Sequence, residues 1–168
     1  HASDINSVSG IVLPGGESTT ISKLAVIDGL MEPLRLAASS GLPVYGSCAG
    51  MILLADRILD GRPGQETIGG IDMTVRRNAF GRQVDSFEGG IDLQGIHGDP
   101  FPGIFIRAPW VEEIGANVEV LGRVGAGLAE GRIVAVRERN LIATSFHPEL
   151  TGDTRVHRYF VEMVRQAA

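Results

Sequence analysis

The feature that most constrains this chain is a single cysteine set between glycines at the end of an apolar run. Leu42–Ser47 is a strand candidate, and the sequence continues through Cys48 into Ala49–Leu59, whose apolar residues indicate a helix. Together they give Gly46-Ser47-Cys48-Ala49-Gly50, the G-x-C-x-G form of the elbow on which α/β hydrolases expose a nucleophile. We therefore expect a reactive thiol. The alternative is a cysteine buried for packing alone.

The elbow has a physical rationale. Two small glycines leave room where the chain doubles back, and the sharp turn points the cysteine side chain into a cleft. At the start of a helix, the helix dipole favours the thiolate form of Cys48. Backbone N–H groups at the same place, that of Ala49 first, can bind a developing oxyanion.

The same order of elements occurs earlier in the chain. Val8–Leu13 is a short apolar run that ends in Pro14-Gly15-Gly16, which indicates a buried strand and a tight turn. A helical pattern starts at Ile21 after Ser and Thr residues suited to capping, and Met31–Ser39 is a second helical stretch. Two strand–turn–helix units predict an α/β fold with an open, mostly parallel sheet flanked by helices, in one domain over residues 1–168.

The rest of the chain indicates short strands and one final helix. Glycine and proline separate the expected strands, which are Ile71–Arg76, Val84–Gly90, Ile104–Arg107, Val118–Val124 and a hairpin of Ile133–Arg137 with Leu141–Phe146 about Arg139-Asn140. These strands would add an antiparallel portion to the sheet. In Thr154–Gln166 the apolar residues recur at helical spacing, so one face of a helix should pack on the sheet.

A cysteine nucleophile needs a base, and His147 is the best placed of the four histidines. It ends a strongly apolar run, where the turn after a strand would put it beside Cys48 at the carboxyl edge of the sheet. Glu149 lies two residues further on, and its carboxylate can fix the tautomer of the imidazole. The sequence therefore predicts a triad of Cys48, His147 and Glu149. The alternative is a strand-capping histidine beside a solvated glutamate.

A glycine-rich turn precedes the first helix and offers a second wall for the site. It lacks the G-x-x-x-x-G-K-[ST] pattern of a phosphate-binding loop. The backbone N–H of Gly16 could complete an oxyanion hole with Ala49, and Glu17 and Ser18 could contact a substrate. The alternative is a plain tight turn.

Two arginine-containing stretches remain open to more than one interpretation. Arg76–Arg82 carries three arginines around an aromatic residue, which is typical of a nucleic-acid contact or of a solvated basic loop. Phe105–Pro109 places Arg107 at the end of a strand, where a guanidinium would suit a substrate carboxylate or a surface ion pair.

Charge and cysteine content exclude several classes of function. The formal net charge is −5, which argues against broad binding to nucleic acid or to an anionic membrane, and no apolar run reaches membrane-spanning length. One cysteine cannot form an internal disulfide, so we expect a reducing, cytoplasmic location. The spacing of cysteine and histidine does not fit a zinc site, so we expect neither a metal nor a cofactor.

Taken together, the motifs resemble those of one family over nearly the whole chain, from about Val8 to the final helix. They are L-P-G-G-E-S-T-T, G-S-C-A-G-M-I-L-L-A, R-N-A-F-G-R-Q-V-D-S-F-E, F-I-R-A-P and F-H-P-E-L. The chain is similar to the glutaminase subunits of pyridoxal 5′-phosphate synthase (the PdxT family), which are class I, triad-type glutamine amidotransferases. The elbow and H-P-E are shared with other triad amidotransferases, and the remaining blocks narrow the resemblance to this subunit.

The resemblance implies a flavodoxin-like three-layer fold and a reaction. L-Glutamine would be hydrolysed to glutamate and ammonia, and the ammonia would pass to a (β/α)₈-barrel synthase subunit that builds pyridoxal 5′-phosphate. Cys48 would be the nucleophile, His147 the base and Glu149 the residue that orients it. The family's glutamine-binding positions fall on Gly16, Glu17, Ser18, Arg77, Ile106 and Arg107.

One departure from the family bears on these expectations. The family normally begins with a further strand and helix, including an L-Q-G turn at the rim of the active site, and the resemblance implies that both are absent here. Two alternatives to an active glutaminase therefore remain: a non-catalytic interaction module of the same fold, and a related γ-glutamyl cysteine hydrolase.

Overall fold

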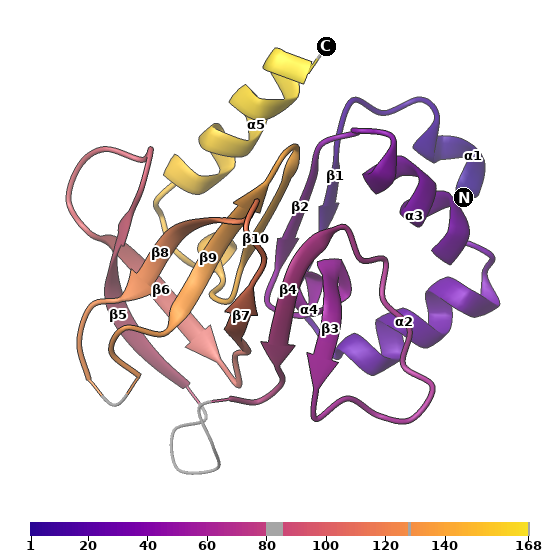
Figure 1. Ribbon diagram of the computed structural model, residues 1–168. Coiled ribbons are helices and arrows are strands. Elements are labelled where there is room, and N and C mark those ends of the chain that lie inside the picture. Colours follow the sequence, from indigo (N-terminus) through magenta and orange to yellow (C-terminus); the bar gives the residue numbers. More distant parts are fainter. Residues whose placement is uncertain (80–85, 128, 168) are drawn as a thin grey trace.

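The computed structural model describes residues 1–79, 86–127 and 129–167. Ten strands of these residues form one curled, mixed sheet (Figure 1), in which seven follow the order β1-β2-β10-β9-β7-β4-β3 and β5, β6 and β8 extend from β9. The strands are β1 (Ile11–Leu13), β2 (Val44–Ser47), β3 (Ala55–Leu59), β4 (Ile71–Arg76), β5 (Ser86–Leu93), β6 (Phe101–Ile106), β7 (Trp110–Ile114), β8 (Glu119–Val124), β9 (Ile133–Glu138) and β10 (Leu141–Thr144).

The parallel part of the sheet centres on β2, which lies between β1 and β10 and runs parallel to both. In this register Ser47, the last residue of β2, lies opposite Thr144, the last residue of β10. Because the carboxyl ends of parallel strands meet at one edge of a sheet, the segments that follow these two residues emerge side by side.

The expected α/β architecture, with a parallel sheet and an added antiparallel portion, is confirmed. Among the described residues, β3 and β4 form a third parallel pair. Six other pairs are antiparallel, among them β9 with β10 and β5 with β6. Counted by pairs of neighbouring strands in the described residues, the antiparallel portion of the sheet is therefore larger than the parallel one.

Helices cover both faces of the sheet. They are α1 (Ala2–Ile5), α2 (Ser18–Ile27), α3 (Met31–Ser39), α4 (Ala49–Leu54), the short 3₁₀ helix η1 (Pro148–Leu150) and α5 (Arg155–Ala167). In Figure 1, α5 lies on the far side of the sheet from α1, α2 and α3. Side chains alternate along β2, so Val44 joins a core with α2, α3 and α4, whereas Tyr45 joins a second core with Phe160 of α5.

The sequence-based expectation of one helix over Ala49–Leu59 was wrong in its second half. The helix ends at Leu54, and Ala55–Leu59 forms β3, paired in parallel with β4. Arg57 in β3 donates to Thr74 Oγ1 at 2.9 Å across this pair. Pairing with a strand far along the chain decides this segment, and a local apolar pattern cannot reveal it.

Most other expected elements were found at or close to their predicted positions. α3 and β4 have the predicted bounds, and the hairpin of β9 and β10 turns at Arg139, whose φ is 53°. β5 begins at Ser86 and runs to Leu93; residues 84 and 85 of the expected strand lie outside the described residues. The sequence did not predict β7 or α1.

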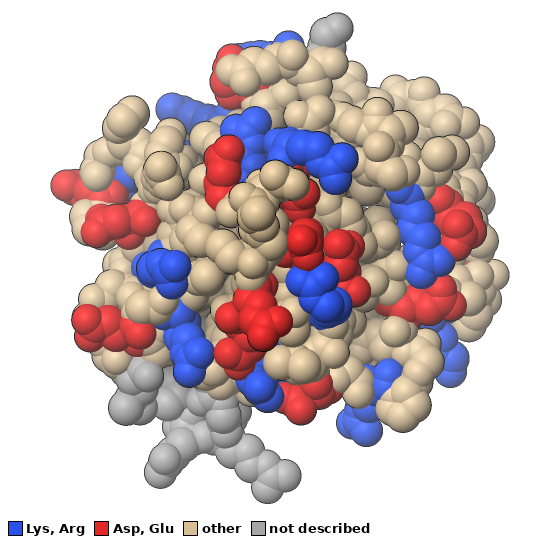
Figure 2. All heavy atoms as spheres, in the orientation of Figure 1, with Lys and Arg blue, Asp and Glu red and all other residues tan. Residues whose placement is uncertain are grey.

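Charge and hydropathy on the surface agree with the acidic but balanced composition. On the face drawn in Figure 2, acidic and basic side chains are interspersed. Arg76 illustrates this, because it pairs with Asp60 at 2.8 Å and also with Glu112. Within the described residues, no helix has the length and apolar character that crossing a lipid bilayer requires.

Candidate active site

The elbow at Cys48 is built by close backbone packing. Cys48 has φ 50° and ψ −101°, a region that side-chain-bearing residues rarely occupy. A Cβ on Gly46 would lie 2.5 Å from the backbone of Gly50, and a Cβ on Gly50 would lie 2.3 Å from the carbonyl oxygen of Leu13. Both glycines are therefore required where α4 turns back against β1 and β2.

Cys48 is nearly enclosed, with 7% of its surface exposed. Burial raises the pKa of its thiol to about 11. Hydrogen bonds from the backbone N–H groups of Ala49 and Gly16 act in the opposite direction and lower this pKa, but by less. The expected thiolate-favouring effect of the helix start is therefore outweighed, because burial penalises the charged form more. Because the N–H groups of Ala49 and Gly16 both act on this thiol, they lie close to where an oxyanion would develop if the thiol attacked a carbonyl.

His147 and Glu149 lie together beside this thiol. His147 Nδ1 lies 2.7 Å from Glu149 Oε1, and the imidazole is largely buried while the carboxylate is half exposed. A Cβ on Gly15 would lie 2.4 Å from His147 Cε1 and 3.5 Å from Cys48 Cβ, so the imidazole and the elbow flank the same glycine. With Nδ1 engaged by Glu149, Nε2 is the ring nitrogen left for proton transfer.

Main-chain hydrogen bonds to two neighbouring strands, β10 and β6, hold the backbone of Cys48 and His147 in place. The N–H of Cys48 donates to the carbonyl of Thr144 at 2.8 Å, and the N–H of His147 donates to the carbonyl of Ile104 in β6 at 2.9 Å. Below them, the Tyr45 hydroxyl bonds to Thr144 Oγ1 at 2.8 Å. The backbone of both candidate residues is thus bonded to strands of the sheet.

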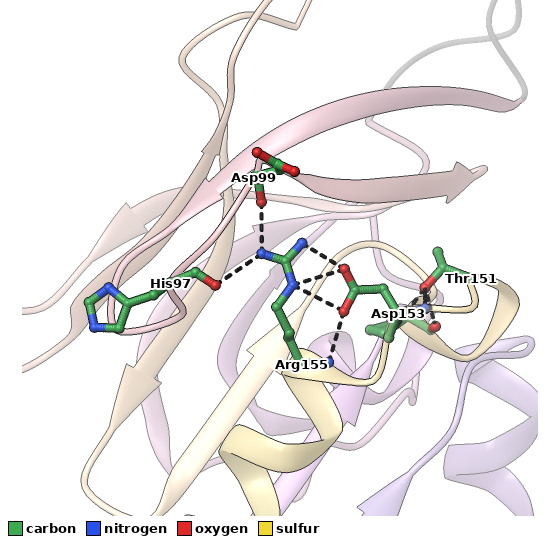
Figure 3. Close-up of polar contacts among 6 residues, drawn as sticks. His97, Asp99, Thr151, Asp153 and Arg155 are labelled. Carbon is green, nitrogen blue, oxygen red and sulfur yellow. Dashed lines mark hydrogen bonds and ion pairs between the residues drawn. The ribbon is translucent and has the colours of Figure 1, made fainter.

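One arginine holds the segment that follows Glu149 (Figure 3). Arg155 donates to both carboxylate oxygens of Asp153 at 2.6 to 3.1 Å and to the main-chain carbonyls of His97 and Asp99 at 3.2 and 2.7 Å. The hydrogen bonds from Arg155 lower the pKa of Asp153. This clamp joins the turn behind Glu149 to the loop between β5 and β6.

A pocket of about 720 Å³ opens over Cys48 and His147. Eight residues singled out from the sequence line it, and they are Gly16, Glu17, Ser18, Cys48, Arg77, Ile106, Arg107 and His147. Glu149 reaches His147 from outside the lining, and Ala49 is buried directly behind the thiol. Residues 80–82 of the arginine-containing stretch 76–82 lie outside the described residues.

The acidic residue in the pocket wall is already engaged. Glu17 Oε1 accepts from the N–H of Thr19 at 3.1 Å and from Arg77 at 2.9 Å. Its Oε2 accepts from the N–H and the hydroxyl of Thr20 at 2.7 and 2.8 Å. Burial alone would raise the pKa of Glu17, but the hydrogen bonds from Thr20 and Thr19 lower it to about 2. Glu17 therefore caps α2 and holds the Arg77 guanidinium.

Sequence reasoning missed part of the pocket wall. Arg62 and Pro63 line it, and Gln65 lies behind them with its amide bonded to Ser18 and Arg77. All three belong to the loop between β3 and β4, to which the sequence assigned no element and no role. In the described residues no group of three or more His, Cys, Asp or Glu side chains is arranged to hold a metal ion.

The chain is similar in sequence to one protein family over almost its whole length. Residues 1–166 match the model of the SNO glutamine amidotransferase family. Pyridoxal 5′-phosphate synthase subunit PdxT of Streptomyces coelicolor is 64% identical over 162 residues, which cover 96% of this chain and 78% of that protein. The subunit of the same name from Kineococcus radiotolerans is 64% identical over 168 residues, 99% of this chain and 81% of that protein.

Solved structures share the fold of this chain. A crystal structure described as a glutamine amidotransferase is 43% identical, with a TM-score of 0.88 over 98% of this chain and 83% of that one. The glutaminase domain of Trypanosoma brucei CTPS is 15% identical, with a TM-score of 0.63 over 98% of this chain and 74% of that one. At that identity it shows a shared fold only.

Proposed function

This chain belongs to the SNO glutamine amidotransferase family, and on that premise we propose that Cys48, His147 and Glu149 form its catalytic triad. The activity is that of a glutaminase that releases ammonia from L-glutamine for pyridoxal 5′-phosphate synthesis. The observation that carries the triad is the pairing of His147 with Glu149 at 2.7 Å beside the only cysteine, at the edge where β2 and β10 end.

In the first step, Cys48 attacks the side-chain carbonyl carbon of glutamine. The raised pKa of its thiol means that attack must be coupled to proton transfer, and His147 Nε2 accepts that proton. Glu149 stabilises the imidazolium that forms through its bond to Nδ1. A buried thiol stays protonated until the base and the substrate are both in place, which limits wasteful reactivity.

The tetrahedral intermediate carries its negative charge toward the elbow. The N–H groups of Ala49 and Gly16 hold this oxyanion, and removal of one such donor typically costs about 10²–10³ in rate. His147 then gives its proton to the leaving nitrogen, so ammonia departs and a γ-glutamyl thioester remains on Cys48. The same imidazole next activates a water molecule, which cleaves the thioester and releases glutamate.

The outer pocket binds the amino-acid end of the substrate. Arg77 and Arg107 both line it, and a guanidinium is suited to a substrate α-carboxylate. Ser18 at the start of α2, Gly16 and Ile106 also line the pocket. Because the four recorded donors occupy the carboxylate of Glu17, its part in glutamine binding is to hold Arg77.

The partner is a pyridoxal 5′-phosphate synthase subunit, which consumes the ammonia. We propose that it is a (β/α)₈ barrel, as in the family that the motifs resemble, and that the complex works in the cytoplasm. Neither a metal nor a cofactor enters the proposed steps. The family match favours this function over an interaction module or a γ-glutamyl hydrolase.

The test is a substitution of the nucleophile in the assembled complex. Cys48→Ala should abolish ammonia release from glutamine and leave binding to the synthase subunit unchanged. Glutamine turnover retained by this variant would overturn the triad. Turnover of γ-glutamyl peptides in preference to glutamine by the wild-type complex would instead support the hydrolase alternative.

A further inference from the structure

The loop between β3 and β4 contributes a side chain that sequence reasoning passed over. Gln65 Oε1 accepts from Arg77 Nη1 at 3.1 Å and from Thr19 Oγ1 at 3.3 Å. On the other side of the same amide, Nε2 donates to Ser18 Oγ at 3.0 Å. One side chain therefore bonds to two residues that line the pocket, Ser18 and Arg77.

The direction of these bonds decides what Arg77 and Ser18 can offer a ligand. The side-chain carbonyl oxygen of Gln65 faces the guanidinium. The amide NH₂ group could not take this place, because it is a donor and could not accept the hydrogen bond from Arg77. Glu17 and Gln65 each accept a hydrogen bond from one terminal nitrogen of Arg77, and these two bonds fix the plane of its guanidinium group. Ser18 accepts from Gln65 and so keeps its own hydroxyl proton for an acceptor in the pocket.

The backbone that directly follows Gln65 is anchored by contacts within the chain itself. Ser22, which is 2% exposed on α2, accepts from the N–H of Glu66 at 3.0 Å and donates to its carbonyl at 2.8 Å. Arg35 of α3 donates to the carbonyl of Thr67 at 2.8 Å. The amide of Gln65 is thus presented from a rigid support, as accurate positioning requires.

We propose that Gln65 is a positioning residue for glutamine binding, which sets Arg77 and Ser18 to receive the substrate's α-carboxylate. The proposal rests on the glutaminase function given above. Gln65 touches no reacting atom, so it acts on the affinity for glutamine and leaves the chemical step unchanged. Uniform binding of this kind appears in KM and not in kcat.

Steady-state glutaminase kinetics of the full chain with its synthase subunit test the proposal. Gln65→Ala should raise KM for glutamine roughly tenfold, the usual effect of losing a hydrogen bond to a charged group, and change kcat less than about twofold. Gln94→Ala is the matched control, because Gln94 is exposed and lies outside the pocket. If Gln65→Ala has a lowered melting temperature, Gln65→Met replaces it, because methionine keeps the length of the side chain without the amide group.

A double-mutant cycle separates positioning from a general structural role. Arg77→Lys keeps a charge but loses the fork, so Gln65→Ala in that background should raise KM less than about threefold. An unchanged KM in Gln65→Ala, an equal tenfold rise in both backgrounds, or a loss confined to kcat would overturn the proposal. Failure of the wild-type complex to release ammonia would instead overturn the proposed function itself.

Discussion

Gly15 separates His147 from Cys48 so narrowly that no larger residue fits there. A Cβ at this position would lie 2.4 Å from Cε1 and 3.0 Å from Nδ1 of the imidazole, and 3.5 Å from the Cβ of the cysteine. Gly15 does not have a positive φ, so space and not backbone conformation demands the glycine. The turn after β1 therefore limits how closely the proposed base and the proposed nucleophile can approach each other.

Gly15→Ala should lower kcat by about 10² or more. The added methyl group must displace the imidazole, and a misplacement of about 1 Å costs roughly that factor. Ammonia release by the assembled complex measures it. Gly152→Ala is the control, since a Cβ there meets nothing within 4 Å. An alanine variant at position 15 with wild-type kcat would show that the imidazole works from another position.

Glu149→Gln should reduce kcat by about 10² to 10⁴ and alter the melting temperature little. An amide can still bond to His147 Nδ1, but it cannot stabilise the imidazolium or hold the same tautomer. The half-exposed side chain contributes little to folding. Single-turnover and steady-state kinetics measure the loss, and Glu162→Gln on the exposed face of α5 serves as control. A KM effect without a kcat effect would contradict the assignment.

Alkylation of the only thiol should report its protonation. Burial raises the pKa of Cys48 from its ordinary value of 9.0 to about 11, so the folded protein holds less thiolate than the unfolded chain at any pH below that value. The rate with iodoacetamide should rise about tenfold per pH unit up to pH 11, whereas the denatured chain should level off near pH 9. A native plateau near pH 9 or below would contradict the enclosed thiol.

The same shift gives folding stability a pH dependence of defined sign. Because the folded pKa lies above the unfolded one, the stability tied to the protonated thiol is fully present below pH 9 and is lost as pH rises toward 11. Urea denaturation should show wild type losing stability relative to Cys48→Ala between pH 9 and 11. Parallel curves for the two proteins would argue against the shift.

Arg155→Ala should lower the stability of the protein and change kcat by a larger factor than KM, with kcat falling. The substitution leaves the carbonyls of His97 and Asp99 and the carboxylate of Asp153 without their shared donor, behind the turn that carries Glu149. Thermal melting and kinetics measure the two effects. Arg165→Ala, which removes only a solvent-exposed pair at 3.7 Å, should change neither.

Local sequence pattern was enough to predict the strands and the turn that carry the proposed triad. The apolar runs at β2 and β10 and the turn glycines lie within short windows, so the sequence predicted Cys48 at a strand–helix turn and His147 after a later strand. The resemblance to a family then suggested which loop residues meet a ligand. That these residues share one pocket required the sheet order, which a single sequence does not contain.

Long-range pairing explains most of what sequence analysis missed. Ala55–Leu59 has the composition of a helix end, but it pairs with β4 and so becomes a strand. That change reshapes the following loop and brings Gln65 to Arg77, a contact between residues twelve positions apart. The high pKa of Cys48 was also missed, because it follows from burial by distant elements and not from the adjacent helix.

The parallel pairing of β2 with β10 places the proposed nucleophile and the proposed base just after adjacent strands. The arginines Arg77 and Arg107, which line the pocket, instead follow β4 and β6 outside the strands. Strand register resists change, because a shift by one residue turns every side chain to the other face. Loops tolerate insertion and substitution far better. Substitutions in the turns could therefore change which amide substrate is bound while the proposed triad beside the strands stays in place.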